Sequence, residues 1–262
     1  MSNPFDAEVL PRRVMPLIFI VDTSGSMGGA KIASLNTAVR EALNDVGEIS
    51  KANADAQIKV AALEFSSGTS WMYDKLIEAE SFQWQDLIAS GLTSFGAACE
   101  ELNKKLSKSH GWMAEPTGMR APAIILLSDG GPTDDWEHTL EKLKGNRWFK
   151  VACKIAIAIG DDANKQVLTK FTGSIESVIT VHDVEQLKRI IHTVSVTSSM
   201  VNSKSSDVGT SSSSNGVSTP IADPTQQVVN VIKNDVNTDP TLSGVDLGNS
   251  TTNAGSDDWD KW

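Results

Sequence analysis

The chain is poor in the residues that carry thiol, imidazole or phenol groups. Its 262 residues include two cysteines, four histidines and one tyrosine. Cys99 and Cys153 each lie in an apolar stretch without the spacing of metal ligands, so we expect buried free thiols and no disulfide. The histidines fall in no hydrolase motif, which argues against a histidine-assisted serine nucleophile. The side chains that remain for binding or catalysis are mainly those with hydroxyl and carboxylate oxygens.

Long apolar runs and basic patches are also missing. No stretch approaches the roughly 20 residues of a membrane-spanning helix. The apolar run that follows Arg12 and Arg13 is too short for a secretory signal, and no cleavage site follows it. The formal net charge is −10, which opposes binding by phosphate neutralisation. We therefore expect a cytoplasmic protein with no membrane span and no nucleic-acid partner.

Composition changes near residue 197. Residues 197–262 are rich in Ser, Thr, Asn and Gly and carry eight aspartates against three lysines. Such a segment cannot bury enough apolar surface to offset the entropy of ordering it, so a disordered tail is predicted. The chain then divides into an N-terminal extension (1–12), one domain (13–196) and this tail (197–262).

Within the domain, apolar runs alternate with amphipathic helical patterns. Strands are predicted at 14–22, 57–65, 123–129, 150–160 and 175–181, with a short pair at the sheet edge within 70–79. Helices are predicted at 31–52, 94–108, 134–145, 163–173 and 183–199. Near-continuous apolar strands separated by helices indicate a three-layer, Rossmann-like α/β domain with a mostly parallel central sheet.

Polar loops follow three of these segments. The first holds Asp22, Ser24 and Ser26, the second holds Thr93 at the start of a helix, and the third holds Asp129 after a strand. In open parallel sheets, ligands bind outside the carboxyl ends of the strands, so these loops are expected to meet at one edge. Carboxylates and hydroxyls without His or Cys favour a hard cation, Mg²⁺ or Mn²⁺.

These residues resemble a known site. "DTSGSM", "GLTSFG" and "LLSDG" are similar to the three parts of the metal-ion-dependent adhesion site of von Willebrand factor A domains, and the resemblance extends over about residues 14–196. It implies that the hydroxyls of Ser24, Ser26 and Thr93 bind the ion, while Asp22 and Asp129 coordinate it directly or through water. It also implies a non-enzymatic adaptor whose protein partner supplies an Asp or Glu to the cation.

A narrower resemblance concerns "SDGGPTDDW", which is most similar to TerY-like proteins of bacterial tellurium-resistance and stress-response clusters. It implies a stress-response or phosphosignalling assembly, with a Ser/Thr kinase or a protein phosphatase as partner. Gly131 stands where the usual pattern has Glu, and the Ser-rich tail lies outside the pattern.

Other chemistries fit the same loops less well. A phosphohydrolase of haloacid-dehalogenase type would use Asp22 as nucleophile, with Asp129 and Asp134 on Mg²⁺, but Ser24 replaces the second acid that this chemistry needs. Asp134 is more simply a first-turn helix acid. Lys31 lacks the Gly before it and the Ser or Thr after it that a phosphate loop requires.

Two segments outside these loops hold candidates for partner contact. Trp112 and Met113 lie in a long Pro- and Gly-containing connection, where an exposed contact patch and packing onto the domain are equally open. Trp259 and Trp262 lie in "DDWDKW", where aromatics in an acidic segment indicate a short docking motif.

Overall fold

A computed structural model describes residues 12–114, 118–204 and 223–248. Its centre is a seven-stranded sheet in the order β3-β2-β1-β5-β6-β7, with β4 also paired to β2. Strands β1, β2, β5, β6 and β7 are parallel, while β3 and β4 run antiparallel to β2. The strands are β1 (Arg13–Asp22), β2 (Ala56–Phe65), β3 (Thr69–Trp71), β4 (Ile77–Glu78), β5 (Ala123–Ser128), β6 (Cys153–Ile159) and β7 (Val178–Val181).

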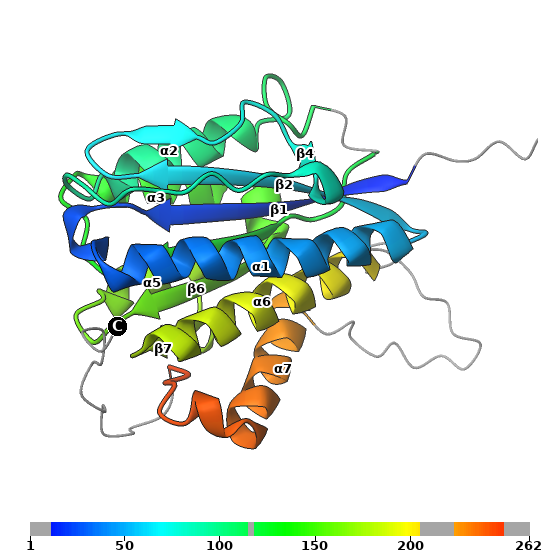
Figure 1. Cartoon of the computed structure of the whole chain (residues 1–262). Helices are drawn as coiled ribbons and strands as arrows, with labels where there is room; N and C mark the ends of the chain where they lie inside the picture. Colours follow the sequence, from blue (N-terminus) through cyan, green and yellow to red (C-terminus); the bar gives the residue numbers. More distant parts are fainter. Residues whose placement is uncertain (1–11, 115–117, 205–222, 249–262) are drawn as a thin grey trace, which may run out of the picture.

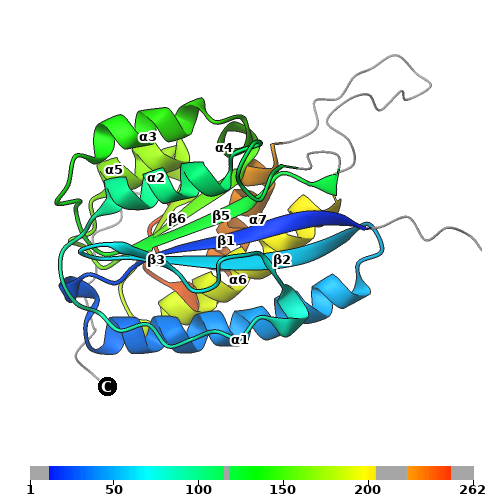
Figure 2. The same cartoon turned by 90° about the horizontal axis from the view of Figure 1, so that it is seen from above.

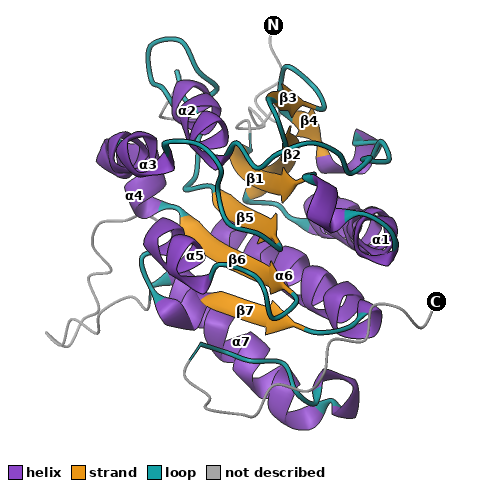
Figure 3. Cartoon of the chain, turned by 90° about the vertical axis from the view of Figure 1, so that its left-hand side faces the viewer, coloured by secondary structure: helices purple, strands orange, loops and turns teal. Residues whose placement is uncertain are grey.

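Helices cover both faces of this sheet (Figures 1 and 2). On one face lie α1 and α6, with α7 beside them; α2, α3, α4 and α5 lie on the other (Figure 3). The helices are α1 (Ala30–Ala52), α2 (Phe95–Lys105), α3 (Trp136–Gly145), α4 (Arg147–Val151), α5 (Lys165–Thr172), α6 (Val184–Lys204) and α7 (Pro224–Thr238). The predicted three-layer α/β fold with a mostly parallel sheet is therefore confirmed.

The side-chain alternation of β1 explains why both faces are covered. Leu17 and Phe19 pack into the core under α1 and α6, whereas Ile18 and Ile20 pack into the core under α2, α3 and α5. Because successive strand residues point to opposite faces, a strand that is apolar at every position needs a helical layer on each side.

Two strand predictions began too early, and local capping explains both. Residues 150–152 are not strand, because Asn146 accepts the Trp148 N–H at 2.9 Å and starts the short helix α4 before β6. Residues 175–177 form a 3₁₀ turn, because Ser174 Oγ accepts the Glu176 N–H at 3.3 Å. Cys99 and Cys153 are free and buried, as expected.

The prediction of a disordered tail is wrong for two parts of it, residues 197–204 and 223–248. Residues 197–204 continue α6, and residues 223–248 form α7, a 3₁₀ turn and an antiparallel bridge between Asp246 and Thr180 of β7. Val228, Val229 and Ile232 are buried against α6. The Ser-rich composition of the whole segment concealed this one amphipathic helix, which supplies enough apolar burial to order it. Residues 205–222 and 249–262 lie outside the described structure.

Replacing Ile232 by alanine tests the packing of α7. The side chain is 1% exposed, so we expect the free energy of unfolding to fall by about 2–5 kcal/mol through lost burial and a cavity. Val231→Ala is the matched control, because that neighbour is 39% exposed and should change stability by less than about 0.5 kcal/mol. Urea unfolding curves give both values; equal effects would mean that α7 does not pack on the domain.

Among the described helices, none combines the length and the apolar character that crossing a membrane requires.

Candidate functional site

The polar loops meet at the carboxyl edge of the sheet, the edge that faces the viewer in Figure 3. Strand β1 lies between β2 and β5, so the connections that leave β1 and β5 diverge at this point. Val21 pairs with Leu127, which brings the residues that follow them, Asp22 and Ser128, side by side. A switch point of this kind opens a crevice at the strand ends, and the site lies there.

Asp22 is the last residue of β1 and is fully buried. Its Oδ1 accepts the backbone N–H of Ser24 at 2.9 Å, and its Oδ2 accepts the Ser128 hydroxyl at 2.7 Å. Burial raises the pKa of the Asp22 carboxyl above its ordinary value, although the hydrogen bonds from Ser24 and Ser128 act in the opposite direction. The site thus holds a desolvated carboxylate that a cation would stabilise.

Ser26 connects the first loop to the third. Its hydroxyl donates to Asp129 Oδ1 at 2.7 Å and lies 3.1 Å from the Ser24 hydroxyl. The other carboxylate oxygen of Asp129 is 2.7 Å from the ammonium of Lys31, on the first turn of α1. The Asp129 side chain is 1% exposed, whereas Ser26 is exposed, so the site opens to solvent on the Ser26 side.

Thr93 is held at the same edge by the third loop. Its N–H donates to Thr133 Oγ1 at 3.1 Å, and its carbonyl accepts the Thr133 N–H at 2.9 Å. The Thr93 and Ser26 hydroxyl oxygens both lie within 4.0 Å of the position that a Cβ would take on Gly130. A side chain at residue 130 would therefore stand between the second and first loops, and glycine leaves that space open.

The arrangement fits a small divalent cation. Adjacent oxygen ligands of an octahedral Mg²⁺ at about 2.1 Å lie about 3 Å apart, close to the 2.7 Å and 3.1 Å separations at Ser26. Hydroxyl and carboxylate oxygens are the donors that hard cations prefer. No group of three His, Cys, Asp or Glu side chains suited to a metal exists among the described residues. Any ion here would depend on the hydroxyls.

Asp134 has a different role from the one that a phosphohydrolase would give it. Its two carboxylate oxygens accept the N–H groups of Gly96 and Ala97, at 3.0 and 3.1 Å, and so cap the N-terminus of α2. It is a helix acid, as the sequence favoured, but it serves a neighbouring helix and not its own.

The residues predicted to contact a partner differ in how far they are exposed. Met113 is fully buried in the core under α2, so it is no surface contact and its prediction is wrong. Trp112 is half-buried, stacked edge-on against Trp71 at 4.7 Å, with its indole N–H 3.3 Å from the Asp74 carbonyl. The loop folds down because its apolar side chains find cover there. Trp259 and Trp262 lie outside the described residues.

Sequence reasoning missed three residues that build the site. Ser128 holds Asp22, Thr133 holds Thr93, and Lys31 pairs with Asp129. Ser128 and Thr133 both lie within the stretch "SDGGPTD", on either side of Asp129 and the two glycines, so their position was a usable signal. Lys31 has no comparable signal in the sequence, because its contact with Asp129 depends on the direction in which α1 leaves the loop.

Several solved structures share this fold. A von Willebrand factor type A protein from Catenulispora acidiphila matches with a TM-score of 0.53 and 18% identity, covering 72% of this chain and 43% of that one. Proximal thread matrix protein 1 from the mussel byssus, in a form with a zinc-occupied MIDAS motif, matches with 0.52 and 19%, covering 71% and 48%. The pilus adhesin SpaC from Lactobacillus rhamnosus GG gives 0.53 and 17%, covering 70% and 30%.

These likenesses concern the fold, and the chain spans less than half the length of each of the three proteins. The family comparison goes further. Residues 17–193 match the von Willebrand factor type A domain, a range that runs from β1 into α6 and includes all three polar loops. This chain belongs to the von Willebrand factor type A domain family.

Proposed function

We propose that this protein is a metal-dependent protein-binding module. Ser24, Ser26 and Thr93 hold a divalent cation through their hydroxyls, and Asp22 and Asp129 supply the negative charge. Two carboxylates leave the ion with affinity for a further anionic ligand, and a partner's Asp or Glu completes its coordination. The surrounding loops then determine which partner fits.

One observation carries this proposal. Five oxygen-bearing side chains from three loops lie at the carboxyl edge of β1 and β5, and Ser26 among them is exposed to solvent. A merely structural turn would need only one serine as a cap, and Ser24 makes no side-chain capping bond to the turn that follows it. Binding a cation accounts for the whole set.

The proposals for the ion and for the partner are based on the sequence. Mg²⁺ or Mn²⁺ is proposed because all the donors are oxygen atoms. The mussel protein has a zinc-occupied MIDAS motif, so the affinity for Zn²⁺ should be compared with the affinities for these two ions. The TerY-like motif "SDGGPTDDW" supports a bacterial stress-response or phosphosignalling assembly in the cytoplasm, with a kinase or phosphatase as partner. These assignments rest on resemblance.

The binding role is favoured over phosphoryl transfer by the state of Asp22. A nucleophilic carboxylate must present an oxygen to the phosphorus, but both Asp22 oxygens accept hydrogen bonds inside the fold. The position two residues on is Ser24, which is a poor general acid, and Asp134 is engaged at α2. We therefore propose no enzymatic activity.

Removal of one hydroxyl tests the function. Immobilised protein is expected to capture a partner from a lysate of the source cells in Mg²⁺ and to release it in EDTA. Thr93→Ala should abolish this capture, since one ligand is lost. Thr238→Ala, an exposed threonine on α7, should capture normally. Quantitative mass spectrometry of the bound fraction measures all four; capture that survives both EDTA and Thr93→Ala would rule out the metal-dependent role.

A further inference from the structure

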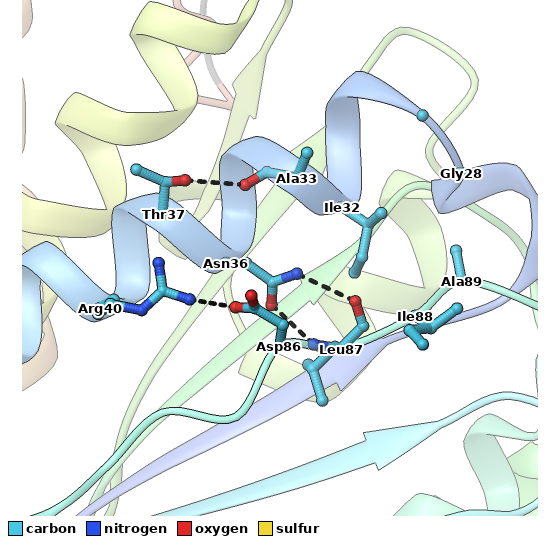
Figure 4. Close-up of a pocket in the computed structure, with 11 residues that line it drawn as sticks. Gly28, Ile32, Ala33, Asn36, Thr37, Arg40, Asp86, Leu87, Ile88 and Ala89 are labelled. Atoms are coloured by element: carbon cyan, nitrogen blue, oxygen red, sulfur yellow. Dashed lines mark hydrogen bonds and ion pairs between the residues drawn. The ribbon is translucent and has the colours of Figure 1, made fainter.

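A hollow lies beside the proposed metal site, between the first half of α1 and the segment 86–89 (Figure 4). Its volume is about 490 Å³, within the roughly 300–1,000 Å³ typical of pockets that hold organic groups. Its lining includes Gly28, Asn36, Arg40, Asp86, Leu87 and Ile88. The hollow therefore begins two residues after Ser26.

The wall of the hollow is fixed by hydrogen bonds to α1. The Asn36 amide donates to the Leu87 carbonyl at 3.0 Å and accepts the Leu87 N–H at 2.9 Å, as drawn in Figure 4. Arg40 pairs with Asp86 at the far end. The wall is thus held in place without a ligand, which lowers the entropic cost of filling the hollow.

The same wall continues into the metal loops. The Ser90 N–H donates to the Thr23 carbonyl at 2.7 Å, and the Gly91 carbonyl accepts the Gly25 N–H at 3.1 Å. Along this stretch Ile88 is 80% exposed and Leu92 is 61% exposed, the two most exposed large apolar side chains in the described structure. A ligand that reaches the cation therefore passes exposed apolar surface that it could cover.

The occupant that this surface fits is present in the sequence. Residues 257–262, "DDWDKW", place Trp259 between Asp258 and Asp260. A carboxylate for the cation and an indole for the hollow are then neighbours on one short segment. We propose that residues 257–262 dock on their own domain, with one of the three aspartates on the metal and Trp259 in the hollow, so that the segment competes with the partner. This inference rests on the proposed function.

The strand register allows this docking. Asp22 and Ser128 are adjacent, Ser128 pairs with Ala158, and Ala158 pairs with Thr180. Thr180 pairs in turn with Asp246, so Asp246 lies at the same level of the sheet as Asp22. Four strand spacings of about 4.8 Å separate them, or about 19 Å.

The connecting chain is long enough to cross that distance. Residue 257 follows Asp246 by eleven residues. An extended chain spans up to about 3.3–3.6 Å per residue, so these residues reach about 36 Å, well beyond the strand spacings to be crossed. The acidic segment also matches the positive charge of the cation and of Lys31 beside it.

Paramagnetic broadening tests the proposal on the full chain. The seven tryptophan indole N–H signals are recorded by NMR, and Trp259→Ala identifies one of them. Equimolar Mn²⁺ should broaden the Trp259 signal beyond detection, together with the amides of Gly25 and Gly130 at the site. With all three aspartates of residues 257–262 changed to Asn, the amides should still broaden, and the Trp259 signal should persist.

A substitution at Ile88 tests whether the hollow holds Trp259. Ile88→Ser should restore much of the Trp259 signal in Mn²⁺, whereas Val231→Ser on α7, also an exposed apolar residue, should not. Broadening of Gly25 and Gly130 without Trp259 overturns this inference and leaves the proposed function intact. If the Gly25 and Gly130 amide signals do not broaden, Mn²⁺ does not bind at the site. The proposed function is then wrong, and the docking that rests on it is overturned as well.

A second copy of the chain is the other possible host. Isotope-labelled Thr93→Ala chain, which lacks a metal ligand, is mixed with unlabelled native chain and Mn²⁺. Docking within one chain predicts a sharp Trp259 signal from the labelled copy. Broadening of that signal would show that the segment binds another molecule, and would overturn docking on its own domain.

Discussion

The Asp22→Ala variant is expected to bind Mn²⁺ or Mg²⁺ about a hundredfold more weakly than the native chain, which is the upper end of the loss that removing a metal-site group commonly causes. It should also be less stable without metal. The Ser24 N–H and the Ser128 hydroxyl would lose their shared acceptor in a fully buried place, at about 1–3 kcal/mol for each unsatisfied group. Isothermal titration with the metal alone and urea unfolding measure the two effects.

Asp22→Asn separates the two effects. Its amide oxygen still accepts the Ser24 N–H, and its NH₂ group donates to the Ser128 hydroxyl, which can rotate to accept. Because burial raises the pKa of Asp22, the native carboxylate is costly without metal, and a neutral amide removes that cost. We expect metal binding to be lost and stability to be kept. Tight metal binding by Asp22→Asn would contradict the site.

The Lys31→Met variant should have effects of opposite sign. Its ammonium stands 2.7 Å from Asp129 and repels a cation bound beside that carboxylate, at a cost of about 1–2 kcal/mol even in a water-like dielectric. Removing the charge should therefore tighten Mn²⁺ binding about tenfold. Without metal, the nearly buried Asp129 loses a partner, and stability should fall by about 1–3 kcal/mol.

Lys51→Met controls for the change in net charge. Lys51 lies on the same helix, is 56% exposed and pairs only across the surface with Glu48 among the contacts described for it. Its loss should change neither metal affinity nor stability by much. Calorimetric titration of both variants with Mn²⁺ decides the matter: weaker binding by Lys31→Met would mean that the lysine supports the ion.

The sheet and the three polar loops were predictable for simple reasons. The strand 14–22 is apolar at every position, which requires cover on both faces, and parallel strands bring their carboxyl ends to one edge. Asp22 and Asp129 could therefore be placed together although they are 107 positions apart in the sequence. The contact between Lys31 and Asp129 could not be predicted, because it depends on the angle at which α1 leaves the loop.

The predictions for Met113 and for the C-terminal segment were wrong for a common reason. In both places, packing against the rest of the domain decides the structure of a short segment. Met113 lies in a Pro- and Gly-containing loop, but a buried site under α2 was available to it. Helix α7 begins with the capping Asp223 and with Pro224 at its first turn, both ordinary start signals. The composition of the Ser-rich residues around them nevertheless favours disorder, which hides these signals.

The bridge between Asp246 and Thr180 also affects how the sheet ends. Strand β7 closes one side of the sheet, and an uncovered strand there would offer a row of free N–H and C=O groups to other chains. Asp246 takes up two of those groups, with N···O distances of 2.8 and 3.1 Å. On the opposite side, β3 and β4 are three and two residues long. Both borders of the sheet are thereby poor templates for edge-to-edge aggregation.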